Sequence, residues 1–189
     1  MIDTAPMTAK QFLELLEDGQ RWMELVRGRL VRLEPPDAVH GNAVRNLSAA
    51  LSKQFRQEPG LFACYELGLI TAFEPDTVRC PAISCFRVEG GLGELDRLTT
   101  ERVPELVIEV ASSNDRREAM SERIQGYVDW GVPAIWVFDP ESQHAHVFLQ
   151  GETPRMLKEN ERLIGAPTIP GFGITVGDVF ADPKWAQTP

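Results

Sequence analysis

Apolar positions along the chain switch repeatedly between helical and strand spacing, which predicts an α/β protein. Thr8 with Gln11 forms a capping box ahead of a short amphipathic helix. Residues 21–33 then read as two short strands around an Arg27-Gly28 turn, which predicts a β-hairpin. The chain therefore begins with a helix and a hairpin.

A second amphipathic helix follows, with Asp37 as its predicted N-cap. Five of its residues recur at helical spacing and are expected on one face: His40, Val44, Leu47, Leu51 and Phe55. Residues 60–73 and 78–86 each contain a predicted strand. The glycine-rich stretch 88–103 predicts a loop.

The clearest strand is ELVIEVA at 105–111, which is apolar almost throughout, as expected for a central strand covered on both faces. Asp115 with Glu118 predicts the start of a helix that runs to about Trp130. Further strands are predicted at AIWVFD, HAHVFL and PRMLKE, before a closing PGFGITVGDVF segment. This order predicts a mixed sheet with helices on its faces.

The length of 189 residues, with 43% hydrophobic and 25% charged residues, predicts one globular domain over 1–189 with a core of about 8–180. No apolar run is long enough to span a bilayer, so no membrane partner is expected. Three cysteines without paired spacing predict reduced thiols and a cytoplasmic protein.

The net charge of −9 argues against a protein that coats a phosphate backbone without sequence preference. It does not exclude a nuclease, because a nuclease site collects carboxylates that hold a metal ion.

Two glutamates are candidate site residues. Glu109 lies within the apolar strand, where an ionised carboxylate is costly unless it is paired or bound to a metal. The alternative is a plain ion pair at the end of the strand. Glu24 lies in the predicted hairpin, where a solvated edge position is the alternative.

His40 lies on the apolar face of its helix, either as a site residue or as a hydrogen-bonded core histidine. Arg123 shares a helix face with Tyr127, so it either pairs with an acid such as Glu122 or points toward Glu109. His144 and His146 could bind zinc, but no third ligand is evident, which favours an ordinary exposed strand.

Taken together, the segments resemble one family, the Uma-type restriction endonucleases of the PD-(D/E)XK nuclease superfamily. The resemblance spans about Thr8 to Phe180 and rests on these segments: WMELVRGRLVRLEPP, DAVHGNAVRNLSAAL, TVRCPAISCF, VPELVIEVASSNDR, ERIQGYVDWGVPAIWVFDPE and IPGFGITVGDVF. It implies a restriction-endonuclease-like α/β fold, a mixed sheet flanked by helices.

The resemblance also implies a site in which carboxylates hold Mg²⁺ or Mn²⁺ to cut phosphodiester bonds of DNA. The family's two glutamates fall on Glu24 and Glu109, and its helical lysine falls on Arg123. Its metal-binding aspartate falls on Ala82, which cannot ligate a metal, and the ordinary superfamily lysine position is Ala111. Metal binding is therefore expected to be weak or absent.

Two functions are consistent with this pattern. The first is a metal-dependent DNA endonuclease with an impaired catalytic set, in which Glu24, Glu109, Arg123 and His40 act. The second is a catalytically inactive nuclease fold that binds nucleic acid or protein. A homodimer stays open, because related nucleases often dimerise.

Overall fold

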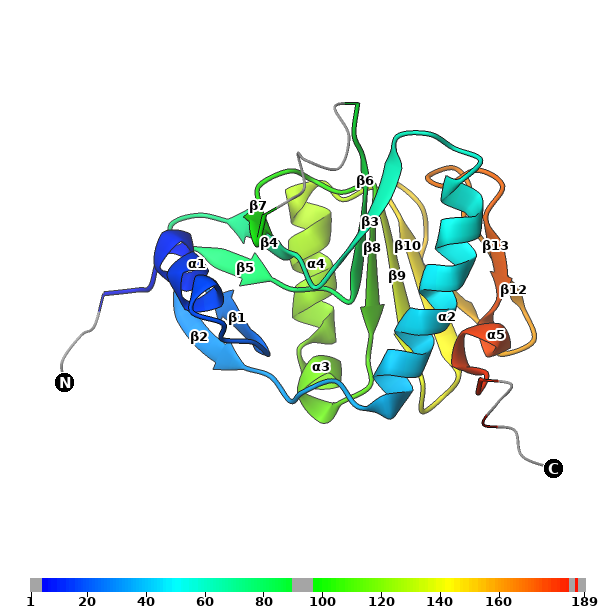
Figure 1. The fold of residues 1–189 in the computed structure, drawn as a ribbon, viewed down its shortest axis with the longest axis horizontal. Coiled ribbons are helices and arrows are strands. Elements are labelled where there is room, and N and C mark those ends of the chain that lie inside the picture. Colours follow the sequence, from blue (N-terminus) through cyan, green and yellow to red (C-terminus); the bar gives the residue numbers. More distant parts are fainter. Residues whose placement is uncertain (1–4, 90–96, 184–185, 187–189) are drawn as a thin grey trace.

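The strands form two main sheets, which lie side by side with α1 at one end of the molecule and α2 toward the other (Figure 1). The computed structural model describes residues 5–89, 97–183 and 186, without the side chains of residues 114 and 115. The smaller sheet has the order β2-β1-β5-β4-β7. Its strands are β1 (Met23–Val26), β2 (Arg29–Arg32), β4 (Gly68–Ala72), β5 (Thr77–Arg79) and β7 (Thr99–Thr100).

The predicted hairpin is confirmed as β1 and β2. Val26 pairs with Arg29, which leaves a two-residue turn at Arg27 and Gly28. Both turn residues have positive φ, 50° and 73°, as a type I′ turn requires. This turn matches the right-handed twist of the two strands and fixes their register.

The larger sheet has the order β11-β10-β9-β8-β6-β3. Only β8 and β9 run parallel within it, so the predicted mixed sheet is confirmed. Its strands are β3 (Leu61–Tyr65), β6 (Ile83–Arg87), β8 (Leu106–Val110), β9 (Ala134–Asp139), β10 (His144–Leu149) and β11 (Arg155–Leu157). A separate ribbon pairs β12 (Arg162–Ile164) with β13 (Gly173–Thr175).

The helices are α1 (Ala9–Glu17), α2 (Ala38–Phe55), α3 (Asn114–Glu118), α4 (Met120–Trp130) and α5 (Val176–Phe180). Helices α2 and α5 pack on one face of the larger sheet and α4 packs on the other, whereas α1 packs on the smaller sheet. The helix predicted to run unbroken to Trp130 is in fact two, α3 and α4, which meet at Ala119. The capping role predicted for Asp115 concerns a side chain outside the described part.

Strand β8 is fully buried and divides the core into two layers. Alternate residues point to opposite faces of a strand. Leu106, Ile108 and Val110 therefore join the cluster beneath α2 and α5, whereas Val107 joins the cluster beneath α4. Glu109 has the same parity as Val107, so its carboxylate points toward α4.

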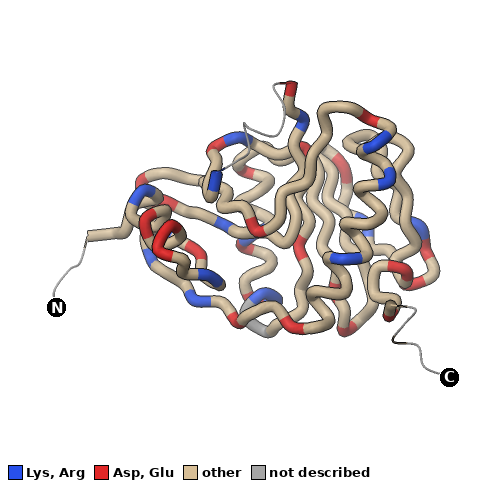
Figure 2. The backbone as a smooth tube through the Cα atoms, viewed as in Figure 1, with Lys and Arg blue, Asp and Glu red and all other residues tan. Residues whose placement is uncertain are grey.

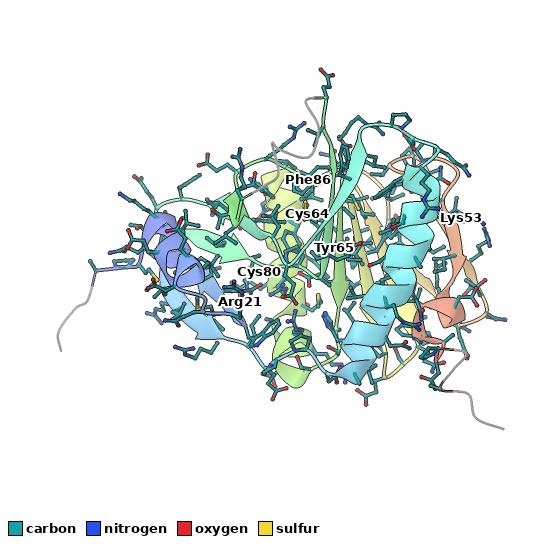
Figure 3. All side chains as sticks on the ribbon, viewed as in Figure 1. Arg21, Lys53, Cys64, Tyr65, Cys80 and Phe86 are labelled. Carbon is teal, nitrogen blue, oxygen red and sulfur yellow. The ribbon has the colours of Figure 1, made fainter. Side chains whose placement is uncertain are left out.

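The two strands predicted at 60–73 and 78–86 are each divided in two by the fold. The chain leaves the larger sheet after β3, forms the β4–β5 hairpin of the smaller sheet, and returns as β6. The crossing back occurs at Cys80 to Ala82, between the two sheets. Figure 3 shows Cys80 at this crossing, between the small-sheet end and the larger sheet.

The predicted loop at 88–103 is only partly described, because residues 90–96 lie outside the described residues. The described part adds β7 as a short strand parallel to β4. Among the described residues, no helix combines the length and apolarity needed to cross a membrane.

Candidate functional site

Glu24 comes from the smaller sheet and is fully buried between the two sheets, not solvated at an edge. Its Oε1 accepts a hydrogen bond of 2.8 Å from the backbone N–H of Cys80, and its Oε2 accepts one of 3.0 Å from Arg79. Arg79 is the last residue of β5, and Cys80 begins the segment that crosses between the sheets. The end of β5 and the start of the crossing therefore supply two of the groups that hold this carboxylate.

Glu109 comes from the larger sheet and is also fully buried. Its Oε1 accepts from the hydroxyl of Tyr127 at 2.7 Å and from two nitrogens of Arg123, Nε at 2.9 Å and Nη2 at 2.6 Å. Its Oε2 is buried and has no hydrogen-bond partner among the described residues. Tyr127 lies one helical turn after Arg123, so both side chains reach β8 from one face of α4.

Arg123 joins the two glutamates. While Nε and Nη2 bond Glu109, its Nη1 donates to Glu24 Oε2 at 2.5 Å. The side chain is 1% exposed. A planar guanidinium has five N–H donors in a fixed fork, which lets it address two carboxylates from different directions at once. One arginine thus ties α4 to both sheets.

Opposite charges determine how the buried groups titrate. Burial, the largest influence, raises the pKa of Glu24, but Arg123, Arg79 and the Cys80 N–H together outweigh it and hold this pKa below its ordinary value. Burial also lowers the pKa of Arg123, and Glu109 with Glu24 raises it well above its ordinary value. These shifts favour the charged forms of Glu24 and Arg123, which pair with each other.

Tyr127 completes the buried cluster as a neutral donor. Burial and the neighbouring Glu109 raise the pKa of Tyr127 well above its ordinary value. The hydroxyl keeps its proton and can donate it to the Glu109 carboxylate. We refer to Glu24, Arg79, Glu109, Arg123 and Tyr127 as the buried network.

The buried network reaches the surface through Arg79, whose side chain is 7% exposed and lies 3.4 Å from Glu122 of α4. Glu122 in turn lies 3.9 Å from the exposed Arg27. Arg79 and Glu122 also line a pocket of about 310 Å³ between α4 and the smaller sheet. Glu24, Glu109 and Arg123 lie beneath this surface and do not line an open cleft.

His40 and Ala82 are near these elements but make different contacts. His40 is buried on α2 and shares a hydrogen bond of 3.0 Å with the Ser112 hydroxyl, just after β8. Burial, then the charge of Arg116, lowers the pKa of His40 to about 4, although Asp37 opposes this. Ala82 precedes β6, the neighbour of β8, and packs in the cluster beneath α2.

The family model described as "Uma2: Putative restriction endonuclease" matches residues 9–177. The chain belongs to the Uma2 family. A crystal structure described as "a putative nuclease belonging to DUF820 from Anabaena variabilis ATCC 29413" has the same fold, with a TM-score of 0.76. It is 18% identical, and the alignment covers 93% of this chain and 98% of that one. No curated protein matches the chain significantly.

The residues of this Uma2 chain do not fit a divalent metal centre of the kind that the resemblance implies. Mg²⁺ prefers near-octahedral oxygen ligands, commonly one or two carboxylates with several waters. Here the carboxylates of Glu24 and Glu109 accept from arginines, position 82 carries a methyl group, and both glutamates are closed to solvent. Within the described ranges no group of three His, Cys, Asp or Glu residues could hold a metal.

His144 and His146 both lie on β10 and are partly buried. No third metal-binding side chain joins them in the part of the chain that the structure describes.

Sequence reasoning brought Glu24, Glu109 and Arg123 together but did not identify the other groups that bond to the two glutamates. Arg79 carried a signal, since it is a charged residue within the strand motif TVRC just before the crossing. Tyr127 was placed on the face of Arg123 without a role. The Cys80 N–H had no signal, because a backbone donor depends only on the path of the chain.

Proposed function

We propose that this Uma2 chain is a nuclease-fold protein that binds nucleic acid without cutting it. The observation that carries the proposal is the position of Arg123, which pairs with both site glutamates. Arginine stays protonated at any working pH, so it stabilises charge but cannot act as a general base. Together with Arg79 it neutralises the two carboxylates that the nuclease reading requires as metal ligands.

Energetics support the same proposal. To reach Glu24 and Glu109, a metal ion would have to break ion pairs that are closed to solvent. Leaving one buried charge without its partner costs about 3–5 kcal/mol. Ala82 contributes no ligand in return, so little binding energy offsets that cost.

One observation favours the second candidate, an active metal-dependent nuclease. Glu109 Oε2 is buried without a hydrogen-bond partner among the described residues. A buried carboxylate oxygen of this kind is expensive, and a cation bound there would satisfy it. Activity would then require Arg123 to move away from Glu109.

The first prediction concerns cleavage and compares the parent chain with Ala82→Asp, Arg123→Lys and the double variant. Plasmid and single-stranded DNA are incubated with Mg²⁺ or Mn²⁺. We expect an inactive parent and an active double variant. The first change restores a carboxylate at position 82, and the second replaces the guanidinium of Arg123, which bridges the two glutamates, with a compact ammonium. Metal assistance is worth several kcal/mol, or orders of magnitude in rate.

Metal binding gives an independent readout. Ala82 is 1% exposed, so an aspartate there should lower the melting temperature of the single variant. Mg²⁺ should raise that temperature in the double variant and leave the parent unchanged, and calorimetry should find no tight site in the parent. Glu109→Gln in the double-variant background controls for a contaminating nuclease.

Three outcomes decide between the functions. Metal-dependent cleavage by the parent that Glu109→Gln abolishes would replace our proposal with the active nuclease. A folded double variant that binds metal but cuts no DNA would contradict the idea that this chain is a nuclease that lost its catalytic residues. A parent that fails to bind labelled DNA in EDTA would contradict the proposal that the protein binds nucleic acid.

A further inference from the structure

A groove of about 660 Å³ lies between α1 and the β4–β7 side of the smaller sheet. We call it the α1 groove. Lys10 and Leu13 line it from α1, Phe73 lines it from the β4–β5 turn, and Arg97 and Arg102 flank it around β7. These residues contribute cations together with an exposed aromatic ring.

The balance of charge in the α1 groove differs from that of the whole chain. Among the described residues that line it, three are cationic (Lys10, Arg97 and Arg102) and two are acidic (Asp76 and Glu101). The chain as a whole carries a net charge of −9, and Figure 2 shows basic and acidic positions interspersed along the backbone. A local excess of cations in such a protein favours an anionic ligand at this place.

The fold holds the Asp76 carboxylate in place, with both of its oxygens accepting from backbone N–H groups. Oδ2 accepts from the backbone N–H of Ala9 at 2.7 Å, and Oδ1 accepts from that of Glu74 at 3.2 Å. This carboxylate holds the start of α1 against the turn. Glu101 is the other acid among the described lining residues, and Arg102 is itself engaged, because its Nη2 donates to the carbonyl of Arg87.

Phe73 supplies the second half of the recognition surface. Phe73 is 57% exposed, so its ring is accessible to a ligand at the surface. It lines both the α1 groove and the neighbouring pocket that contains Arg79 and Glu122. A chain molecule lying across Phe73 would therefore run from the cations of the groove toward the outer end of the buried network.

We propose that the α1 groove binds single-stranded nucleic acid, with phosphates at Lys10 and Arg97 and a base stacked on Phe73. Stacking needs a base whose face is free, which a paired duplex does not offer along its length. A cationic groove combined with an aromatic platform is the general arrangement for single strands. This inference rests on the proposed function and adds the form of nucleic acid and its position.

The test measures fluorescence anisotropy of a labelled oligo-dT strand and of a duplex of equal length, at several NaCl concentrations in EDTA. The parent should prefer the single strand. Lys10→Gln with Arg97→Gln should flatten the plot of log K against log salt by about 0.7 for each cation removed. Phe73→Ala should weaken single-strand binding at least about fivefold, since stacking on an aromatic side chain contributes that much per base.

The matched control is Lys53→Gln with Arg56→Gln, which removes the same charge from the α2 end; Figure 3 shows Lys53 on the far side of the molecule from α1. We expect it to bind like the parent. Equal binding by the parent, Phe73→Ala and the Lys10/Arg97 variant would overturn the proposal that the α1 groove is the binding site, while leaving the proposed function in place. A parent that binds neither probe would overturn both.

Discussion

At the scale of single residues, arginine at position 123 changes what two retained glutamates can do. A lysine ammonium is a compact point charge, whereas the guanidinium of Arg123 forms three hydrogen bonds at once, two to Glu109 and one to Glu24. Each carboxylate is paired with this one arginine. The same two glutamates that suggest a metal centre in the sequence therefore form an ion-pair network in the fold.

His40 provides a prediction at this scale. Its pKa falls from 6.5 to about 4 because burial and Arg116 disfavour its charged form. Below pH 6.5, His40 binds a proton in the unfolded chain but stays neutral in the folded chain. The free energy of unfolding should therefore fall as pH falls from 6.5 toward 4. The contribution is on the order of 2–3 kcal/mol at the acid end of this window.

Urea denaturation of the parent and of His40→Asn at several pH values between 4 and 7 measures this contribution. The variant should lose stability less steeply with falling pH. Identical slopes for the parent and His40→Asn would contradict the assigned shift.

At the scale of elements, the β1–β2 turn is where backbone conformation most restricts the sequence. Gly28 has φ 73°, and a Cβ placed there would lie 2.4 Å from Cβ of Pro6. The carbonyl of Gly28 accepts from the backbone N–H of Met7 at 2.9 Å, and the N–H of Gly28 donates to the backbone carbonyl of Asp76 at 2.8 Å. The turn therefore anchors the segment before α1 as well as the hairpin.

Gly28→Ala should lower the free energy of unfolding by about 1–2 kcal/mol, because alanine resists this conformation and meets Pro6. Gly41→Ala is the matched control. Gly41 lies inside α2 with nothing within 4 Å of its added Cβ, so alanine should stabilise by about 0.5–1 kcal/mol. Chemical denaturation of both variants measures the difference, and equal effects would count against the strained turn.

At the scale of the whole molecule, the buried network joins parts that are far apart in the sequence. Glu24 belongs to the smaller sheet, Glu109 to the larger sheet and Arg123 to α4. Arg123 is the donor common to both glutamates. The junction between the two sheets should therefore depend on this one side chain.

Arg123→Met should destabilise the protein by about 3–5 kcal/mol, because it leaves two carboxylates buried without their shared partner. Arg27→Met removes an arginine whose side chain is 75% exposed and whose ion pair with Glu122 spans 3.9 Å, so it should cost at most about 1 kcal/mol. Thermal and urea unfolding compare the two. Adding Glu24→Gln and Glu109→Gln to Arg123→Met should restore part of the loss, and a further loss would contradict the network.

Periodicity in the sequence determined the first two helices, the first hairpin and the central strand, because each follows from local spacing. It did not indicate α5 or the break between α3 and α4. Leu47 and Leu51 recur at helical spacing beneath α2, and the Arg27-Gly28 turn needs only neighbouring residues. The resemblance likewise aligned Glu24, Glu109 and Arg123 with one site. Local pattern could not show that stretches 60–73 and 78–86 each divide between two sheets, since an apolar run reads alike in either sheet.

Only the tertiary structure decided what the site is made of. The end of β5 and the start of the crossing bring Arg79 and the Cys80 N–H to Glu24, and α4 places Arg123 and Tyr127 against Glu109. A buried carboxylate must find a counter-charge, and the sequence predicts that need from the apolar neighbours of Glu109. Whether the counter-charge is a metal or an arginine depends on which side chains meet across the two sheets. The spacing of residues along the chain does not show which residues meet there.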